Sequence, residues 1–371
     1  MFGVIVKAGF VVNPIAGMGG SVGLKGTDGA DTLQEAFARG GRKVASTRAV
    51  EALVSVRRKD LPLEFLTCSG EMGQDELDSV DMKCTIVCRP GSKTSSEDTK
   101  AAVKAFLRAG AELIIFAGGD GTARDVLEVA DAKAAMIGIP AGVKMHSAVF
   151  ALTPEALGDL VEAFVSEGKT REAEIMDVDE DAYRSGRLDV KLFGYAKVPD
   201  DPANLQAGKT VYRSGSARDE AEEIGQYVAE TMRKGIAYIL GPGTTTETIT
   251  KHLGLHKTVL GVDVIRDGAV VLRDASEAQL LEFLDHQSEA EIIVTPIGSQ
   301  GFFFGRGNQQ ISAEVIRKVG PDRICVIATP TKLKDTGTLR VDTGDKALDD
   351  RLRGPLKVTT GYKRRKLVRV E

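Results

Sequence analysis

Short apolar runs alternate along most of the chain with segments whose apolar residues recur at helical spacing. The run Ala111 to Ala117 is almost continuously apolar, which is typical of a strand buried on both faces of a parallel sheet. The segment Ser95 to Ala109 instead places Ala102, Val103 and Phe106 on one face, after a start rich in serine and acidic residues. This spacing predicts an amphipathic helix.

The first 170 residues repeat this alternation. Strands are expected at Gly9 to Asn13, Leu63 to Thr67, Thr85 to Cys88, Ala111 to Ala117 and Ala135 to Ile139. Helices are expected at Asp31 to Arg39, Val44 to Lys59, Ser95 to Ala109, Thr122 to Ala130 and Pro154 to Gly168. Strands that alternate with helices form parallel sheets, which bind ligands at the carboxyl ends of their strands. We therefore predict an N-terminal parallel α/β domain over residues 1–170.

The pattern changes after Arg171. The segment Arg187 to Phe193 alternates polar and apolar residues, which predicts antiparallel strands, and Val198 to Asp219 has the composition of a long exposed loop or lid. Helices are then expected from Gln226, at Thr246 to Leu253, Glu277 to Leu284 and Ala313 to Val319, with strands at Ile236 to Leu240, Val259 to Leu272, Glu291 to Thr295, Arg323 to Ala328 and Lys357 to Val370. Residues 171–371 are predicted to form a second domain, mixed α/β and β-rich.

Composition limits the partners. A chain of 371 residues is long enough for two domains at roughly one per 150 residues. Its 49 basic and 53 acidic side chains give a net charge of −4, so it has no bulk attraction to nucleic acid or to an anionic membrane. The N-terminal apolar run is interrupted by Lys7 and is too short to span a membrane. We expect a cytoplasmic protein with no nucleic-acid partner and no stable membrane insertion.

The stretch Phe-Ala-Gly-Gly-Asp-Gly-Thr-Ala-Arg-Asp-Val, from Phe116 to Val126, joins a predicted buried strand to a predicted helix. Glycine tolerates positive φ and has no side chain, so this turn is expected to let a ligand approach the backbone, with Asp120 held at the end of the strand. Glycine-bearing turns also follow other strands, and such turns bind phosphate through bare N–H groups. Each turn could equally be only a tight turn. The chain contains no complete P-loop or dinucleotide glycine fingerprint.

Three of the motifs occur together, and in the same order, in one superfamily. They are Asn13-Pro-x-Ala-Gly17, Gly118-Gly-Asp-Gly-Thr122 and Pro140-Ala-Gly-Val-Lys-Met-His146. On these motifs, residues 1 to about 188 resemble the superfamily of NAD kinases and diacylglycerol or sphingosine kinases. More narrowly, the chain resembles a prokaryotic ATP-NAD kinase-like subgroup that includes proteins from acetoin-utilisation clusters, on the motifs Val22-Gly-Leu-Lys-Gly-Thr-Asp-Gly29, Pro140-Ala-Gly-Val-Lys-Met-His146 and Gly307-Asn-Gln-Gln-Ile-Ser312. This resemblance spans nearly the full length.

The chain also departs from this pattern. Ala123-Arg-Asp125 stands where the lipid kinases have x-Asn-Glu, and the loop with Lys144 and His146 replaces their Gly-Thr-x-Asn. NAD kinases continue with a β-rich domain, whereas Tyr238 to Pro330 has the pattern of further βα units. No residue role is therefore carried over to the C-terminal half.

The resemblance implies phosphoryl transfer from ATP, with Mg²⁺ or another divalent cation. Asp120 is the implied catalytic carboxylate, which either accepts the proton of the acceptor hydroxyl or orients Mg²⁺ through water. The residues expected to bind nucleotide phosphates are Asn13, Gly17, Gly19, Gly20, Gly118, Gly119, Gly121, Thr122, Gly142, Lys144 and His146. For Lys144 and His146, the alternatives are surface charge and helix capping, respectively.

A further turn, Gly241-Pro-Gly-Thr-Thr-Thr-Glu247, resembles the phosphate loop of pentose-phosphate isomerases and coenzyme A transferases. The candidate residues for a second phosphate or substrate loop are Gly241, Gly243, Thr244, Thr245, Thr246, Asn308 and Gln309. The alternative for the turn is an N-cap with threonine hydroxyls at the helix start and Glu247 as capping partner. The side-chain amides of Asn308 and Gln309 are suited to hydrogen bonding with the edge of a base or a sugar. Phe302 to Phe304 are expected to pack in the core.

These expectations favour an ATP-dependent kinase that converts NAD to NADP. The alternatives are a kinase of a lipid diol or another small alcohol, and a nucleotide-binding sensor without catalysis. The basic segment Lys363 to Lys366 hints at a membrane-facing strip, although solvated charge explains it as well. Related enzymes commonly assemble as dimers or tetramers, so the resemblance also implies a homo-oligomer.

Overall fold

The computed structural model describes residues 5–24, 30–91, 94–130, 133–142, 145–178, 190–206, 215–297 and 300–371. The chain forms two compact units. The first comprises Met1–Met18, Gly26–Ala38 and Arg42–Lys209, and the second comprises Gly19–Lys25, Arg39–Gly41 and Thr210–Glu371. The two strands that follow residue 170 belong to the first of these units.

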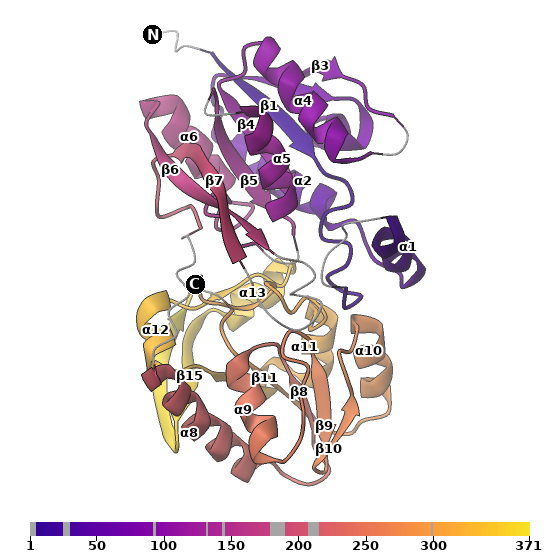
Figure 1. The fold of residues 1–371 in the computed structure, drawn as a ribbon, viewed down its shortest axis with the longest axis vertical. Helices are drawn as coiled ribbons and strands as arrows, with labels where there is room; N and C mark the ends of the chain where they lie inside the picture. The colour runs from indigo at the N-terminus through magenta and orange to yellow at the C-terminus, as the bar shows by residue number, and fades with distance from the viewer. Residues whose placement is uncertain are drawn as a thin grey trace. The chain divides into compact units, whose positions relative to one another are not determined.

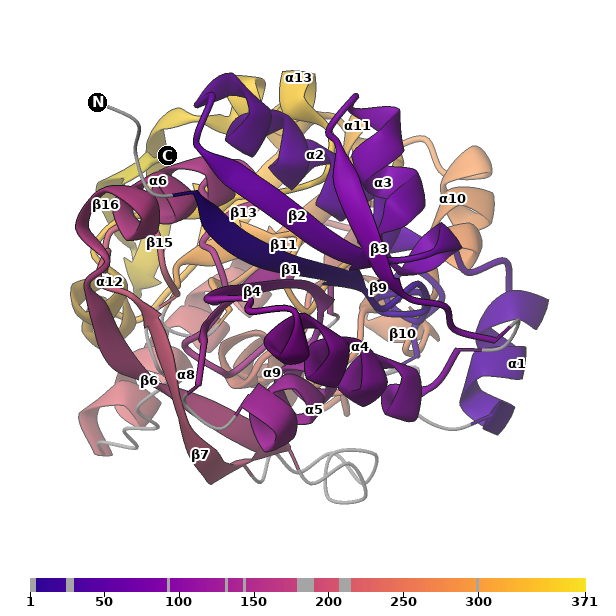
Figure 2. The same ribbon diagram turned by 90° about the horizontal axis from the view of Figure 1, so that it is seen from above.

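The first unit is built on a five-stranded parallel sheet in the order β3-β2-β1-β4-β5. Its strands are β1 (Val6–Val12), β2 (Leu63–Cys68), β3 (Cys84–Cys88), β4 (Leu113–Gly118) and β5 (Ala135–Pro140). Its helices are α1 (Ala30–Ala38), α2 (Val44–Arg58), α3 (Gln74–Ser79), α4 (Ser96–Arg108), α5 (Asp120–Ala130) and α6 (Leu157–Glu167). Figures 1 and 2 show α4 and α5 on one face of this sheet and α2 and α3 on the other.

Burial follows the apolar runs. Every residue of β4 and β5 is buried, as expected for strands covered on both faces. The predicted helix Ser95 to Ala109 is confirmed as α4, and its inward face includes Val103 and Phe106. The short polar helix α3 was missed, because six residues hold less than two turns of apolar periodicity. Helix α5 begins at Asp120, two residues before its expected start.

An antiparallel hairpin follows the parallel sheet. Strand β6 (Thr170–Val178) pairs with β7 (Val190–Pro199), and both strands contact α5 or β5 of the first unit. The lid expected from Val198 to Asp219 is corrected at both ends, because β7 runs to Pro199 and helix α8 (Gly215–Thr231) has begun by Gly215. Residues 207–214 of that segment lie outside the described residues.

The second unit contains a seven-stranded mixed sheet in the order β10-β9-β8-β11-β13-β15-β16. Its strands are β8 (Ala237–Leu240), β9 (Asp263–Arg266), β10 (Ala269–Leu272), β11 (Ala290–Val294), β13 (Ile324–Ile327), β15 (Gly354–Gly361) and β16 (Arg364–Val370). Strands β8, β11, β13 and β15 run parallel, and the edge strands pair antiparallel. This arrangement confirms the expected βα units and antiparallel strands.

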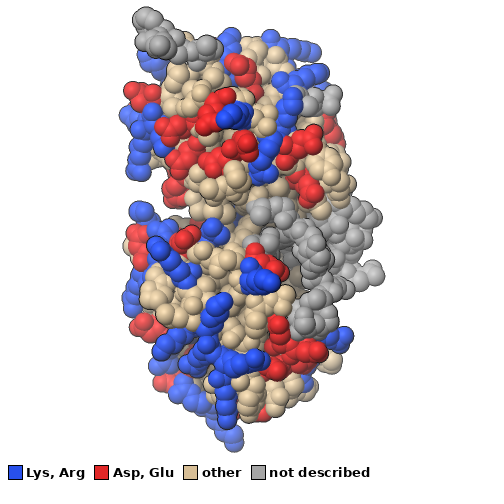
Figure 3. All heavy atoms as spheres, turned by 90° about the vertical axis from the view of Figure 1, so that its left-hand side faces the viewer, with Lys and Arg blue, Asp and Glu red and all other residues tan. Residues whose placement is uncertain are grey.

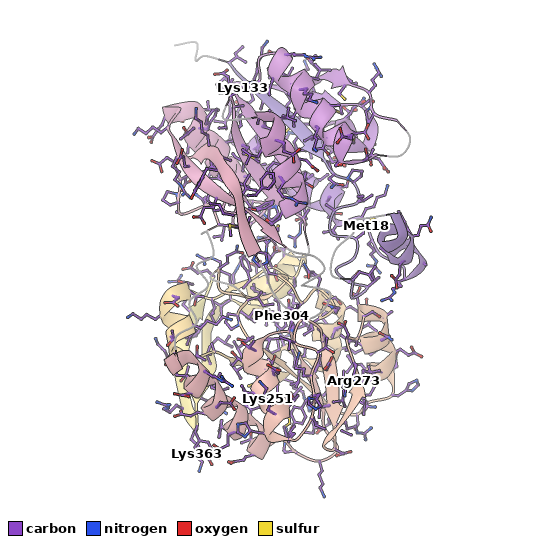
Figure 4. The ribbon with its side chains drawn as sticks, viewed as in Figure 1. Met18, Lys133, Lys251, Arg273, Phe304 and Lys363 are labelled. Atoms are coloured by element: carbon purple, nitrogen blue, oxygen red, sulfur yellow. The ribbon has the colours of Figure 1, made fainter. Side chains whose placement is uncertain are left out.

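Besides α8, the helices of this unit are α9 (Thr244–His252), α10 (Glu277–Asp285), α11 (Ala313–Val319), α12 (Pro330–Thr336) and α13 (Lys346–Leu352). The last two were not predicted, because each buries a single apolar residue and so shows no helical periodicity. Two short strands, β12 (Phe302–Phe304) and β14 (Arg340–Val341), pair separately. Phe302–Phe304 are fully buried, which confirms core packing, and Figure 4 shows Phe304 inside the unit and Lys363 at its margin.

Side chains of both signs of charge lie on the face drawn in Figure 3. Lysine and arginine side chains occur there together with aspartate and glutamate. Among the described residues, no helix has both the length and the apolar character needed to cross a bilayer.

Candidate functional site

Three predicted motifs meet at one edge of the first unit's sheet. Strands β1, β4 and β5 are neighbours and run parallel, so their carboxyl ends lie together. The Asn13 N–H donates to Ala117 O at 3.0 Å, which joins the turn after β1 to the end of β4. The N–H groups of Ala141 and Gly142 both donate to Gly118 O at 3.1 Å. The backbone therefore ties the turns together directly.

Asn13 and Thr122 link the first two motifs through their side chains. Asn13 Nδ2 donates to Thr122 Oγ1 at 3.0 Å, and the Ile15 N–H donates to Asn13 Oδ1 at 3.3 Å. Thr122 lies in the first turn of α5 and is only 4 % exposed. Both side chains thus stabilise the meeting point of the two turns.

The glycines of these turns allow close packing of the chain against itself. A Cβ atom on Gly118 would lie 2.4 Å from Thr122 Oγ1, and one on Gly17 would lie 2.1 Å from the carbonyl oxygen of Ala141. A Cβ atom on Gly119 would lie 3.3 Å from Gly142 Cα. Gly17 has φ +79°, but Gly118 and Gly119 do not require positive φ. At Gly118 and Gly119, neighbouring atoms therefore occupy the space that a side chain would need.

Asp120 is the first residue of α5 and is 9 % exposed. Its Oδ2 accepts a hydrogen bond from the His146 N–H at 2.6 Å, and its Oδ1 accepts one from the Ser147 N–H at 3.0 Å. Such charge-assisted bonds are about twice as strong as neutral ones. The carboxylate faces polar backbone, and it fixes the loop after β5 against the start of α5.

Ser147 completes this connection and was not identified from the sequence. It is fully buried, and its Oγ accepts a hydrogen bond from the Met176 N–H of β6 at 3.0 Å. The Ala148 N–H donates to Glu174 O at 2.8 Å in the same strand. The loop is therefore held from two sides, by Asp120 and by β6. No motif marks Ser147, so only its contacts reveal this role.

The other predicted phosphate-binding residues differ in their placement. Gly121 lies in the first turn of α5, and His146 is buried with its backbone N–H on Asp120. Gly19 and Gly20 belong to the second compact unit, so they are not part of this cluster within the first unit. Lys144 lies outside the described residues.

Comparison with family models matches both halves of the chain. The ATP-NAD kinase N-terminal domain matches residues 8–169, and the ATP-NAD kinase C-terminal domain matches residues 233–370. The chain belongs to the ATP-NAD kinase family. No curated protein and no solved structure matches it in the corresponding comparisons.

The βα pattern predicted for Tyr238 to Pro330 is present in the structure, because β8, β11 and β13 run parallel. It lies within the segment that matches the family's C-terminal domain.

Within this domain, the turn between β8 and α9 differs from the expected N-cap. Gly243 is the N-cap residue, and no side chain caps the helix. The Thr246 hydroxyl points back into the turn, 2.8 Å from the carbonyl oxygens of both Gly241 and Gly243. Glu247 forms an ion pair with Lys251 at 3.2 Å. The alternative in which threonine hydroxyls and Glu247 cap the helix is therefore wrong.

Asn308 supports its own loop. Its side chain is fully buried, Nδ2 donates to Phe303 O at 2.8 Å, and Oδ1 accepts from the Gly305 N–H at 3.1 Å. Because both ends of the Asn308 side-chain amide bond to its own loop, the expected hydrogen bonding to a base or sugar edge does not fit this residue. Gln309 is half-buried in the same loop.

Among the described residues, no group of at least three His, Cys, Asp or Glu side chains is arranged to hold a metal ion. Mg²⁺ in kinases is usually bound by one or two carboxylates together with substrate phosphates and water. Asp120 is a single carboxylate of this kind, and it fits such a site.

Proposed function

We propose that this chain is an ATP-dependent kinase that phosphorylates a hydroxyl group of NAD, giving NADP. Its membership of the ATP-NAD kinase family supports the kinase activity. The observation that carries the proposal is the convergence of the turns after β1, β4 and β5 on Asp120. Phosphoryl transfer depends mainly on positioning and on electrostatic stabilisation, which a fixed cluster of turns can supply.

The proposed roles follow from this geometry. The turns at Asn13 to Gly17 and Gly118 to Thr122, together with Gly142, would bind the phosphates of the donor through backbone N–H groups at the start of α5. Lys144 would offset phosphate charge, and His146 would contribute a further donor. Asp120 would accept the proton of the acceptor hydroxyl or orient the water shell of a divalent cation. The buried hydrogen bonds of Asp120 keep its carboxylate in one position.

A divalent cation would be bound chiefly by the donor's phosphate oxygens, with Asp120 as the nearby protein carboxylate. The cation supplies charge neutralisation for the transferred phosphoryl group. The chain's own contribution is to hold the phosphates and the acceptor in place.

A screen of acceptors with Mg²⁺-ATP tests the proposal. NAD, NADH, sugars and diols are incubated with the full chain, and the phosphorylated product is identified by mass, with inorganic polyphosphate as a second donor. Formation of NADP is the expected result. Phosphorylation of a diol or a sugar but not of NAD would support the alternative acceptor. Binding of ATP and NAD without ADP release would support the sensor and overturn the proposed activity.

A further inference from the structure

The turn from Gly241 to Gly243 lies at the carboxyl end of β8, near the middle of the second unit's sheet. Strands β8 and β11 run parallel and side by side, so their carboxyl ends are neighbours. The Gly241 N–H donates to Ile293 O at 2.9 Å, and the Gly243 N–H donates to Val259 O at 2.7 Å. The turn is therefore fixed by the strands and loops on either side.

The helix after this turn begins with unused donors. The Glu247 N–H donates to Gly243 O, whereas the N–H groups of Thr244, Thr245 and Thr246 donate to no other described residue. The helices that follow in this unit have N-cap side chains that accept from their first turn, namely Ser276, Ser312, Thr329 and Asp345. Thr244 is exposed and Thr245 is 7 % exposed, whereas Thr246 is fully buried, so an external acceptor can approach the N–H groups of Thr244 and Thr245 at the positive end of the dipole.

Thr295 provides a second and independent observation. It follows the end of β11 and is 2 % exposed, and its Oγ1 has no hydrogen-bond partner. Its methyl group lies 2.8 Å from the point where a Cβ atom on Gly243 would be, so the side chain packs directly against the N-cap of α9. A buried hydroxyl without a partner costs free energy, and a ligand that accepts its proton would remove that cost.

We propose that this turn is a phosphate-binding site in the second unit. The donors are the N–H groups of Thr244 and Thr245 and the hydroxyl of Thr295, and the ligand is a phosphate ester such as one phosphate of a nucleotide. Several converging donors at a helix N-terminus match an anion with several acceptor oxygens. The hydroxyl of the buried Thr246 fixes the turn through its hydrogen bonds to the carbonyl oxygens of Gly241 and Gly243. Only the choice of NAD and ATP as probes rests on the proposed function.

Titration of the full chain with inorganic phosphate, ATP and NAD tests the site. The shifts of the backbone amide signals of Thr244, Thr245 and Thr246 are followed by NMR, and affinities are measured by calorimetry. We expect these amides to move with at least one probe. A response to inorganic phosphate alone would identify a free-phosphate site, and a response to a nucleotide would identify the ester. Unchanged amide shifts with all three probes would overturn the proposal.

Two variants separate ligand binding from folding. Thr295→Val keeps the shape and removes the unpaired hydroxyl, so the fold should be at least as stable while affinity falls about tenfold, the equivalent of one hydrogen bond. Thr244→Glu adds a charge at an exposed position where the helix dipole favours it, yet it should lower affinity at least tenfold. The matched control Ala313→Glu places the same charge at the start of α11 and should leave affinity unchanged.

The experiments can refute this phosphate site and the proposed kinase activity separately. If no acceptor is phosphorylated but the amides of α9 respond and Thr244→Glu weakens binding, the kinase proposal fails and this site stands. If NADP forms but Thr244→Glu and Thr295→Val bind every probe with native affinity, this site fails and the kinase proposal stands.

Discussion

Replacing Asp120 with asparagine should both slow turnover strongly and loosen the loop after β5. The carboxylate accepts from the His146 and Ser147 N–H groups at 2.6 and 3.0 Å, and it is 9 % exposed. Asparagine has one acceptor oxygen, so one bond is lost and an amide NH₂ group then faces a backbone N–H. A hydrogen bond to a charged group contributes about 1.5–3 kcal/mol, so the free energy of unfolding should fall by about 2–3 kcal/mol.

Urea unfolding followed by circular dichroism measures this change, with Asp78→Asn as the control. Asp78 is exposed on α3, and the same substitution there should shift stability by less than about 0.5 kcal/mol. In the acceptor assay, kcat should fall by about 10² to 10⁴ if Asp120 accepts the proton, while ATP binding persists. Asp120→Asn with native stability would refute the loop-fixing role, and native kcat would refute the catalytic role.

Two other substitutions test packing and burial. Gly17→Ala places a methyl group 2.1 Å from Ala141 O, whereas Gly40 has the same φ of +79° and open space, so Gly17→Ala should destabilise by at least about 2 kcal/mol more than Gly40→Ala in urea unfolding. Burial lowers the pKa of Lys257 from 10.5 to about 8, so the folded state binds this proton less tightly than the unfolded state. The stability cost is greatest below pH 8 and disappears as the pH rises towards 10.5. As the pH rises from 8 to 10.5, the free energy of unfolding of the wild type should increase by up to about 3 kcal/mol relative to that of Lys257→Met. If urea unfolding gives the same difference between the two proteins at pH 7.5, 9 and 10, the prediction is wrong.

The sequence located the motifs, and the contacts of several residues became visible only in the structure. Gly118 must be small because Thr122 packs against it, which the sequence did not indicate. Asn308 was expected to read a substrate and instead closes its own loop. Ser147 carried no motif at all. In each case, the role depends on atoms that come from elsewhere in the chain or from across a turn.

Local sequence determined the alternation of strands and helices, because burial on both faces demands continuous apolar runs and burial on one helical face demands a period near 3.6 residues. It also determined which turns carry glycine and Asp120. Tertiary structure alone decided that the β6–β7 hairpin belongs to the first unit, that Asp120 binds the loop at His146, and that Thr295 lies against Gly243. These contacts join residues that are far apart in the sequence. They depend on how the strands pair, which no local sequence pattern encodes.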